Sequence, residues 1–507
     1  MSEECAPQQE FVSPEKKISE QEHVQQNIHS QEKEKPTERE SDYEEFELEI
    51  EYEEKDSYKA EPLSTNVPIA LSFTALAFIS RSLWNQNVLA MFIYKVSGHD
   101  PRAIGYCTSL MGLLQLLSSF VGGYFADKYR RDIVIRYSAV IGFLSAVLII
   151  SSVALRNLSF VVVAFATVGT YWGLTTTSLS ALFADSLTDE QRPKYITWRY
   201  TVQKLGNLAA PILAIAMFAA TGNHWSENNC AGVIYFSQAL GLVSTLIPCF
   251  MSDDKTPLSD APSIKSGDEE AHQNESSESN GEAVEIKAPD SPKKNAEKDA
   301  STVTDSVQSI ATIEPQNEKY DIIIPICICA ADILQGFANG MSVQFFPVFF
   351  AKHLFMRPIY VQIVYFFSQA GQAYGSIVGF RLGKKLGRCP VTVFLRCVGC
   401  LALGLMILSH KVKLGTTVVC TFYVFRMIST NSSVPLTGSI LMDYVPKHHR
   451  GKWGSLDSLV KASWSGSAFI GGFLIHRYDI YTVINFTIIM QVIATIPICF
   501  LFKRVLD

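Results

Sequence analysis

Twelve long apolar segments, separated by short polar ones, constrain the fold of this chain more than any other feature. A helix needs about 20 predominantly apolar residues to cross a bilayer, and each segment has close to that length. The sequence therefore predicts an all-α integral membrane protein with twelve transmembrane helices. We place them at residues 67–94, 103–125, 133–154, 158–182, 196–221, 231–251, 321–350, 358–380, 390–409, 414–438, 454–475 and 480–502.

Acidic residues are concentrated outside these segments. Residues 1–66 hold 20 acidic against 7 basic residues, and residues 251–319 hold 16 against 7. This uneven distribution of charge excludes an ordinary acidic soluble protein. Neither stretch has an apolar periodicity that would bury a face, so we expect both to be disordered. We expect a disordered N-terminal tail at 1–66, a six-helix bundle at 67–251, a disordered linker at 252–319, a second six-helix bundle at 320–502 and a short tail at 503–507.

Basic residues in the short loops predict the orientation of the chain. With both termini in the cytosol, the cytosolic loops and the C-terminal tail hold fifteen Lys and Arg, and the opposite loops hold eight. We therefore expect both termini, the acidic tail and the linker to be cytosolic. The host membrane is expected to be the plasma membrane or an endolysosomal or vacuolar membrane.

Two pairs of loops recur along the chain at nearly one spacing. The loop at residues 123–131 is followed by a similar loop at 379–388, and its Arg131 lies 257 residues before Arg388. Two such pairs on one side of the membrane indicate two six-helix halves in parallel topology. The second pair, at an offset of 258, consists of Asp185 with Arg192 after the fourth segment and Asp443 with Arg450 after the tenth.

The loop Gly123-x-x-x-Asp127-Lys128-x-x-Arg131, its weaker copy and the two acid-to-arginine loops resemble the major facilitator superfamily of secondary transporters. The resemblance implies two pseudo-symmetric halves that rock about a central cavity, with these loops as a gate that latches one half to the other. Arg130 stands where the family usually has Gly, and Lys384 stands where the second copy would have an acid. The implied cytosolic gate residues are Asp127, Lys128, Arg131, Asp185, Arg192, Lys385, Arg388, Asp443 and Arg450.

Ionisable side chains near mid-membrane cost roughly 2.5–3.5 kcal/mol each and indicate function. Arg81, Asp332 and Arg426 lie near the middle of the first, seventh and tenth segments, with polar neighbours at helical spacing. In the superfamily that the chain resembles, the first, fourth, seventh and tenth helices line the cavity. The expected substrate-binding residues are Arg81, Trp84, Asn85, Tyr171, Trp172, Asp332, Gln335, Asn339, Arg426, Thr430 and Ser433.

The charges of these residues bear on the substrate. Arg81 and Arg426 against Asp332 leave an excess positive charge, which favours an organic anion such as a carboxylate or phosphate-bearing metabolite. Asp332 is the candidate for proton coupling, because burial and a nearby Arg shift its pKa in opposite directions. Arg396, in the ninth segment, is expected to snorkel or to make a structural contact.

Three alternatives stay open at this point. The substrate is a neutral polar solute, a sugar or nucleoside, if Arg81 and Asp332 neutralise each other. Arg81, Asp332 and Arg426 form a buried network that only fixes packing if no substrate reaches them. A receptor or scaffold that transports nothing would signal through its acidic tails.

Small residues at four-residue spacing predict close helix contacts, which we interpret as sliding surfaces between the halves. They are Gly371, Gly375 and Gly379 in the eighth segment and Ser118 with Gly122 in the second. No phosphate loop, metal-ligand cluster or nucleophile–base pair occurs in the loops, so we expect no enzyme, no cofactor and no metal. The expected partners are a small-molecule substrate, the lipid bilayer and cytosolic partners of the acidic tail; no nucleic acid is expected, and the chain is expected to be a monomer.

Overall fold

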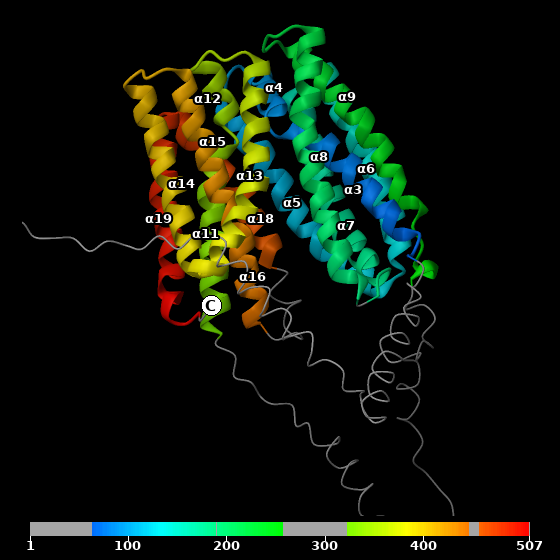
Figure 1. Cartoon of the computed structure of the whole chain (residues 1–507). Coiled ribbons are helices and arrows are strands. Elements are labelled where there is room, and N and C mark those ends of the chain that lie inside the picture. The colour runs from blue at the N-terminus through cyan, green and yellow to red at the C-terminus, as the bar shows by residue number, and fades with distance from the viewer. Residues whose placement is uncertain (1–62, 189, 257–321, 446–455, 506–507) are drawn as a thin grey trace, which may run out of the picture. The chain divides into compact units, whose positions relative to one another are not determined.

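The computed structural model describes residues 63–188, 190–256, 322–445 and 456–505, and every regular element among them is a helix (Figure 1). The predicted all-α fold is confirmed. The first part of the chain, which we call the N half, forms α3 (Asn66–Asn85), α4 (Val88–Val96), α5 (Pro101–Lys128), α6 (Arg131–Leu155), α7 (Leu158–Asp185), α8 (Gln191–Thr221), α9 (Glu227–Leu246), η1 (Ile247–Phe250) and η2 (Asp253–Lys255).

The second part, the C half, repeats this order. It forms α11 (Ile323–Val343), α12 (Phe346–Lys352), α13 (Pro358–Leu386), α14 (Arg388–Lys411), α15 (Thr416–Ser432), α16 (Val434–Tyr444), α18 (Leu456–Arg477), α19 (Ile480–Cys499) and η5 (Phe500–Lys503).

The helix bounds repeat at the offset that the loops predicted. α3 begins at Asn66 and α11 at Ile323, 257 residues later, while α7 begins at Leu158 and α15 at Thr416, 258 residues later. Even the break between α3 and α4 recurs between α11 and α12. The internal duplication is therefore a structural one.

Three membrane spans consist of two helices each: α3 with α4, α11 with α12, and α15 with α16. Pro347 and Pro435 lie in the first turns of α12 and α16. A backbone N–H in a first turn has no partner within the helix, so its absence there is not destabilising. The proline ring, however, prevents the preceding helix from continuing through this position. With each broken pair counted as one span, the halves hold six spans each. Nine of the spans in the described residues are long and apolar enough to cross a membrane; α13, α15 with α16, and α18 are the others.

Helix starts in the loops are fixed by side-chain caps. Asp100, Asn157, Ser226 and Asp479 accept hydrogen bonds from backbone N–H groups in the first turns of α5, α7, α9 and α19. Pro101 follows its cap directly at the first position of α5, where a proline is favourable. These caps set where each short loop ends and where the next span begins.

The two halves, which lie in one compact unit beginning at Ser64, meet where α5 packs against α18 and α8 against α13. Glycines make the first contact possible. A Cβ atom on Gly105 would lie 2.6 Å from the carbonyl oxygen of Ala468, and one on Gly112 would overlap the side chain of Ser465. Only glycine therefore allows α5 to lie this close to α18.

The other small-residue motifs pack inside one half. Gly371 and Gly375 face Ile428 and Ser432 of α15, and Gly122 faces α7. Our interpretation of these motifs as sliding surfaces between the halves is wrong. The four-residue spacing identifies a close helix contact but not which neighbouring helix makes it.

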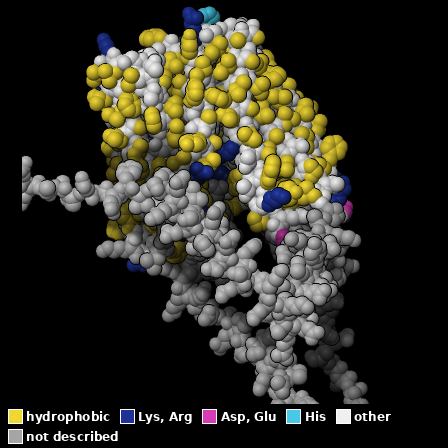
Figure 2. All heavy atoms as spheres, in the orientation of Figure 1, with side chains coloured by type: hydrophobic (Ala, Val, Ile, Leu, Met, Phe, Trp, Pro, Cys, Tyr) yellow, Lys and Arg dark blue, Asp and Glu magenta, His cyan; other side chains and the backbone are white. Residues whose placement is uncertain are grey.

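Hydrogen bonds between the halves lie at one end of the bundle. We call the end where α4 ends and α5 begins the far end, and the end where α3 begins the terminal end. At the far end, Trp225 Nε1 donates to the Met356 carbonyl at 2.9 Å, and the Ile359 N–H donates to Asn223 Oδ1 at 3.1 Å. At the terminal end, no hydrogen bond or ion pair joins the halves between residues that the structure describes. Figure 2 shows Lys and Arg side chains beside a hollow between the two halves, on an otherwise hydrophobic face.

Candidate functional site

Arg81 lies inside the N half against aromatic rings. Its guanidinium carbon is 4.3 Å from the centroid of Trp172, which itself makes edge contacts with Phe78 and Tyr171 at 5.6 and 5.7 Å. Trp84 is buried one turn later on α3, against Phe165. Within the described residues, Arg81 forms no hydrogen bond and no ion pair. The interaction that we find for its guanidinium there is the cation–π contact with Trp172.

Arg426 occupies the corresponding part of the C half and is 1% exposed. It donates a hydrogen bond to Asn339 Oδ1 at 2.8 Å, and Gln491 Nε2 donates to the same oxygen at 2.8 Å. Its guanidinium carbon lies 5.5 Å from the ring centroid of Phe346. No carboxylate among the described residues pairs with it, so within them Arg426 is a buried cation without a counter-charge, whereas Arg81 is only partly buried.

The two arginines are not repeats of each other. At the offset of 257 between α3 and α11, Arg81 corresponds to Ala338, and at the offset of 258 between α7 and α15, Arg426 corresponds to Val168. Arg81 lies on α3 and contacts α7, whereas Arg426 lies on α15, the counterpart of α7, and contacts α11, the counterpart of α3. The sequence predicted both arginines, but not that they lie on non-equivalent helices of the two halves.

Asp332 pairs with Arg396 instead of a cavity arginine. Arg396 donates to Asp332 Oδ1 at 2.6 Å, and the two side chains are 1% and 25% exposed respectively. Arg396 therefore makes a side-chain contact inside the C half instead of snorkelling, and Asp332 does not pair with Arg81. Because Arg396 compensates Asp332, the excess positive charge near Arg81 and Arg426 is larger than the sequence count suggested.

The remaining predicted binding residues have different surroundings. Asn85 is partly buried at the end of α3, and Gln335 is 6% exposed with its Oε1 lacking a partner. Thr430 packs against Gly399 of α14, and the Ser433 hydroxyl donates to the Thr430 carbonyl. The contacts of Thr430 and Ser433 thus lie within the C half.

The gate loops form one ion pair in each half. Arg131 pairs with Asp185 in the N half, and Arg388 pairs with Asp443 in the C half. The two pairs join residues that the internal repeat had already matched. Each of these two pairs stays within its half, and no ion pair between described residues joins the gate loops of the two halves, so the expected latch stays a prediction.

Other predicted gate residues have lesser contacts. Arg192 Nε donates to the Ala184 carbonyl at 3.4 Å, rather than to Asp185. Lys128 lies over the rings of Tyr124 and Tyr129 at 5.7 and 5.8 Å. Asp127 and Lys385 are exposed, and Arg450 lies outside the described residues.

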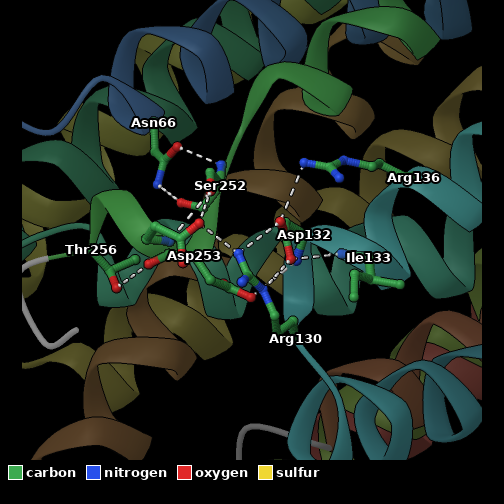
Figure 3. A network of polar contacts seen from close by, with 9 residues as sticks. Asn66, Arg130, Asp132, Ile133, Arg136, Ser252, Asp253 and Thr256 are labelled. Atoms are coloured by element: carbon green, nitrogen blue, oxygen red, sulfur yellow. Dashed lines mark hydrogen bonds and ion pairs between the residues drawn. The ribbon is translucent and has the colours of Figure 1, made fainter.

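A polar network at the terminal end was missed by sequence reasoning (Figure 3). Asn66 donates to the Ser252 carbonyl at 2.8 Å and accepts from the Ser252 N–H at 3.1 Å, while Arg130 bridges Asp132 and Asp254. The start of the predicted linker, residues 252–256, is therefore bound to the N half and not disordered. Residues 257–319 of the linker and 1–62 of the tail lie outside the described residues.

Charges in this network shift the ionisation of two neighbouring acids. Burial raises the pKa of the Asp253 carboxyl, and the nearby Asp132 carboxylate raises it further. Hydrogen bonding from Arg130 lowers the pKa of Asp254. The Arg130 that departs from the family pattern thus has a definite role, since it ties the segment after η1 to the start of α6.

The far end holds a second contact that no local pattern predicted. Asn87 Nδ2 donates to Gln362 Oε1 at 3.1 Å, and Gln362 Nε2 donates back to Asn87 Oδ1 at 2.7 Å. The two amides are 2% and 1% exposed and come from different halves. Their only sequence signal is that each is a polar residue inside an apolar run.

These features define a polytopic membrane protein of two repeated six-span halves, each with one inner arginine, Arg81 or Arg426, that has no carboxylate partner among the described residues. The model of the Major Facilitator Superfamily matches residues 70–456, and the chain belongs to that superfamily of transporters. Its family resemblance is thereby confirmed. Compared by sequence with curated proteins, the chain matches none.

Solved structures of the same fold resemble the chain at low sequence identity. A bacterial homologue of the human lysosomal transporter Spinster, inward-facing and occupied, has a TM-score of 0.62 at 13% identity, over 87% of this chain and 96% of that one. A bacterial homologue of the iron transporter ferroportin, inward-facing, has a TM-score of 0.61 at 12% identity, over 86% and 98%. The nucleoside transporter NupG has a TM-score of 0.55 at 13% identity, over 87% and 99%. At such identities the likeness concerns the fold alone.

Proposed function

We propose that this chain is a secondary transporter of an organic anion, a carboxylate or phosphate-bearing metabolite. The observation that carries the proposal is the pair of inner arginines, Arg81 and Arg426, which have no carboxylate partner among the described residues. A buried charge without a partner costs several kcal/mol. An anionic substrate offsets that cost in each half, and neutral sugars or nucleosides do not.

The pairing of Asp332 with Arg396 strengthens this proposal. The neutral-solute alternative required Asp332 to cancel Arg81, and Asp332 is already paired elsewhere. Asp332 remains our candidate for proton coupling, because it is 25% exposed while its partner is buried. Replacing it by Asn is expected to remove any pH dependence of transport, and an unchanged pH profile of flux would exclude it as the proton carrier.

Alternating access between two states explains where the contacts between the halves lie. The halves are hydrogen-bonded at the far end through Asn87 and Gln362, and lack such bonds at the terminal end between described residues. From the excess of basic loop residues we infer that the terminal end faces the cytosol. The arrangement is then an inward-open one, and the ion pairs Arg131–Asp185 and Arg388–Asp443 hold their own halves rigid while the halves rock.

Flux into proteoliposomes tests the proposal. Purified protein is screened by thermal shift against carboxylates, phosphate esters, sugars and nucleosides, because a ligand of the folded state raises its apparent stability. Hits are then measured for uptake with full-length protein and with a variant that lacks residues 1–60. We expect uptake of an anion by both. Uptake of neutral solutes alone contradicts the anion proposal, and absence of any flux with all hits favours the receptor or scaffold alternative.

Labelling with impermeant thiol reagents tests the topology on which the proposal depends. Single cysteines are placed in a cysteine-free background beside Gly123 and beside Gly379. Parallel halves require both to be labelled from the same side of the membrane. Labelling from opposite sides would contradict the parallel repeat, and the transport mechanism with it.

A further inference from the structure

The N half contains a small, half-open cavity whose lining comes only from its own helices. It measures about 40 Å³, and every residue that lines it belongs to α3, α6, α7 or α9. A volume of this size holds a few water molecules or one small ion, but not an organic metabolite. Its lining includes Arg81, Ser145, Tyr171, Trp172, Gln238 and Thr245.

Two side chains present unused hydrogen-bond donors there. Gln238 is 4% exposed, and its Nε2 has no partner. Arg81 forms no hydrogen bond or ion pair with any residue in the part of the chain that the structure describes. An amide nitrogen left unsatisfied in a buried place costs about 1–3 kcal/mol, and an unpaired guanidinium costs more. A ligand that accepts hydrogen bonds would remove both costs.

The other polar groups in the lining leave few further donors. The hydroxyls of Ser80, Ser145 and Ser244 donate to backbone carbonyls of their own or a neighbouring helix. No residue lining the cavity is Asp or Glu. The cavity therefore combines one positive charge, a free amide donor and no acid, which is the chemistry of an anion site and not of a cation site.

We propose that this cavity binds a small monovalent anionic group between Arg81 and Gln238. The group is either a free ion of the size of chloride or the carboxylate of the transported substrate. The second case rests on the proposed function, and the first does not. The Trp172 ring, which also lines the cavity, lies 4.3 Å from the guanidinium carbon of Arg81 and so helps to hold that side chain at the cavity wall.

Anion-dependent stability of the purified protein, without any transport substrate, tests this site. Thermal unfolding is recorded in the sodium salt of 2-(N-morpholino)ethanesulfonate, with chloride or acetate replacing that anion at constant ionic strength. The sulfonate carries no carboxylate and is too bulky for the cavity, so it serves as the reference anion. We expect a saturable rise in Tm with chloride if the site takes a free ion, and with acetate alone if it takes a carboxylate.

Variants separate site binding from general salt effects. Gln238→Leu removes the free donor at nearly constant size and is expected to fold, because it replaces an unsatisfied polar group. It should weaken the apparent anion affinity about tenfold, and Arg81→Gln should abolish the response. Gln372→Leu is the matched control, since Gln372 is 7% exposed, has an unpartnered Nε2 and lies on α13 of the C half. Its response should equal that of the wild type.

The outcomes are distinct from those of the flux measurements. A linear salt effect, or a saturable one that Gln238→Leu leaves unchanged, overturns the anion site even if organic anions are transported. A chloride response lost in both cavity variants supports the site even if no organic anion is carried. An acetate response lost in both variants supports the site as the place of the substrate carboxylate.

Discussion

The N half and the C half agree at their loops and differ at their centres. Both carry the same ion pair, Arg131–Asp185 in one and Arg388–Asp443 in the other, at an offset of 257 to 258 residues. Their inner arginines do not match. Arg81 lies over a Trp ring with no hydrogen bond among the described residues, whereas Arg426 binds Asn339 and is buried.

This difference teaches which parts of a duplicated membrane bundle are constrained by folding. The ion pairs join the same two helix ends in each half, α5–α6 with α7 and α13–α14 with α15–α16, so they serve the packing of the half itself. In the proposed transporter the centres bind the substrate, and there the two copies have different residues although each has one arginine.

The largest expected effect comes from Arg426. Arg426→Gln should reduce uptake of the anionic substrate roughly tenfold to a hundredfold, because it removes a charged hydrogen-bond donor worth about 1.5–3 kcal/mol. The protein should remain folded, since Asn339 keeps its hydrogen bond from Gln491 and a buried unpaired charge is removed. Initial uptake rates and Tm in detergent are the two measurements.

Arg426→Lys is the matched control for this experiment. It keeps the charge but loses the planar fork, so part of the uptake should return. A sharp drop in Tm together with normal uptake per folded molecule would assign Arg426 to packing alone. The N half sharpens the comparison, because Arg81→Gln should lower uptake without affecting the hydrogen bond between Asn339 and Gln491.

The next largest effect is expected at the ion pair between Asp332 and Arg396, which has no counterpart among the described residues of the N half. Asp332→Asn leaves Arg396 buried without its carboxylate, which should destabilise the protein by roughly 3 kcal/mol. Adding Arg396→Met should restore most of the lost stability, because an apolar side chain needs no partner. Tm values of the two single variants and the double variant complete the cycle. A single variant as stable as the wild type would show that the pair contributes nothing to folding.

A smaller effect is expected where the halves meet at the far end. Replacing both Asn87 and Gln362 by Leu removes two buried hydrogen bonds that exist only in this arrangement, each worth about 1 kcal/mol. The population should shift towards the opposite state by roughly tenfold to thirtyfold. Distances between spin labels at Gly98 and Phe355, in a cysteine-free background, report the separation of the far-end loops. An unchanged distance distribution would mean that the amide pair does not hold the halves together.

The sequence predicted the fold closely, since a membrane span is a local property. Each of the twelve predicted spans overlaps a helix or a broken helix pair, nine of these in the described residues are apolar enough to cross a membrane, and the repeat at 257 to 258 residues matched the helix bounds of the two halves. Side-chain partners were predicted less well. Asp332 and Arg396 are 64 residues apart, and Asn87 and Gln362 are 275 apart, so neither pairing has a local signal.

The gate loops illustrate the same limit. Loop spacing identified Arg131, Asp185, Arg388 and Asp443 as gate residues, but it predicted a latch to the other half rather than a partner for Asp185. The partner, Arg131, begins α6 and meets the end of α7 only when these two helices pack. Residue type and the internal repeat therefore predict which loop residues form ion pairs, but their partners are determined by how the helices pack.

The smallest expected effect tests whether the two loop ion pairs are equivalent. Asp185→Asn and Asp443→Asn should each cost about 0.2–1 kcal/mol, the range of partly exposed ion pairs. The N-half variant should lose more, because Asp185 is 35% exposed and Asp443 is 59% exposed, so solvent screens the second pair more strongly. The loss of stability in each variant is measured as the change in Tm at low and at high salt. High salt should reduce the difference in Tm between the two variants. A larger loss of stability in Asp443→Asn would mean that the C-half loop depends on its ion pair more than its exposure indicates. The two halves would then differ at their loops as well as at their centres.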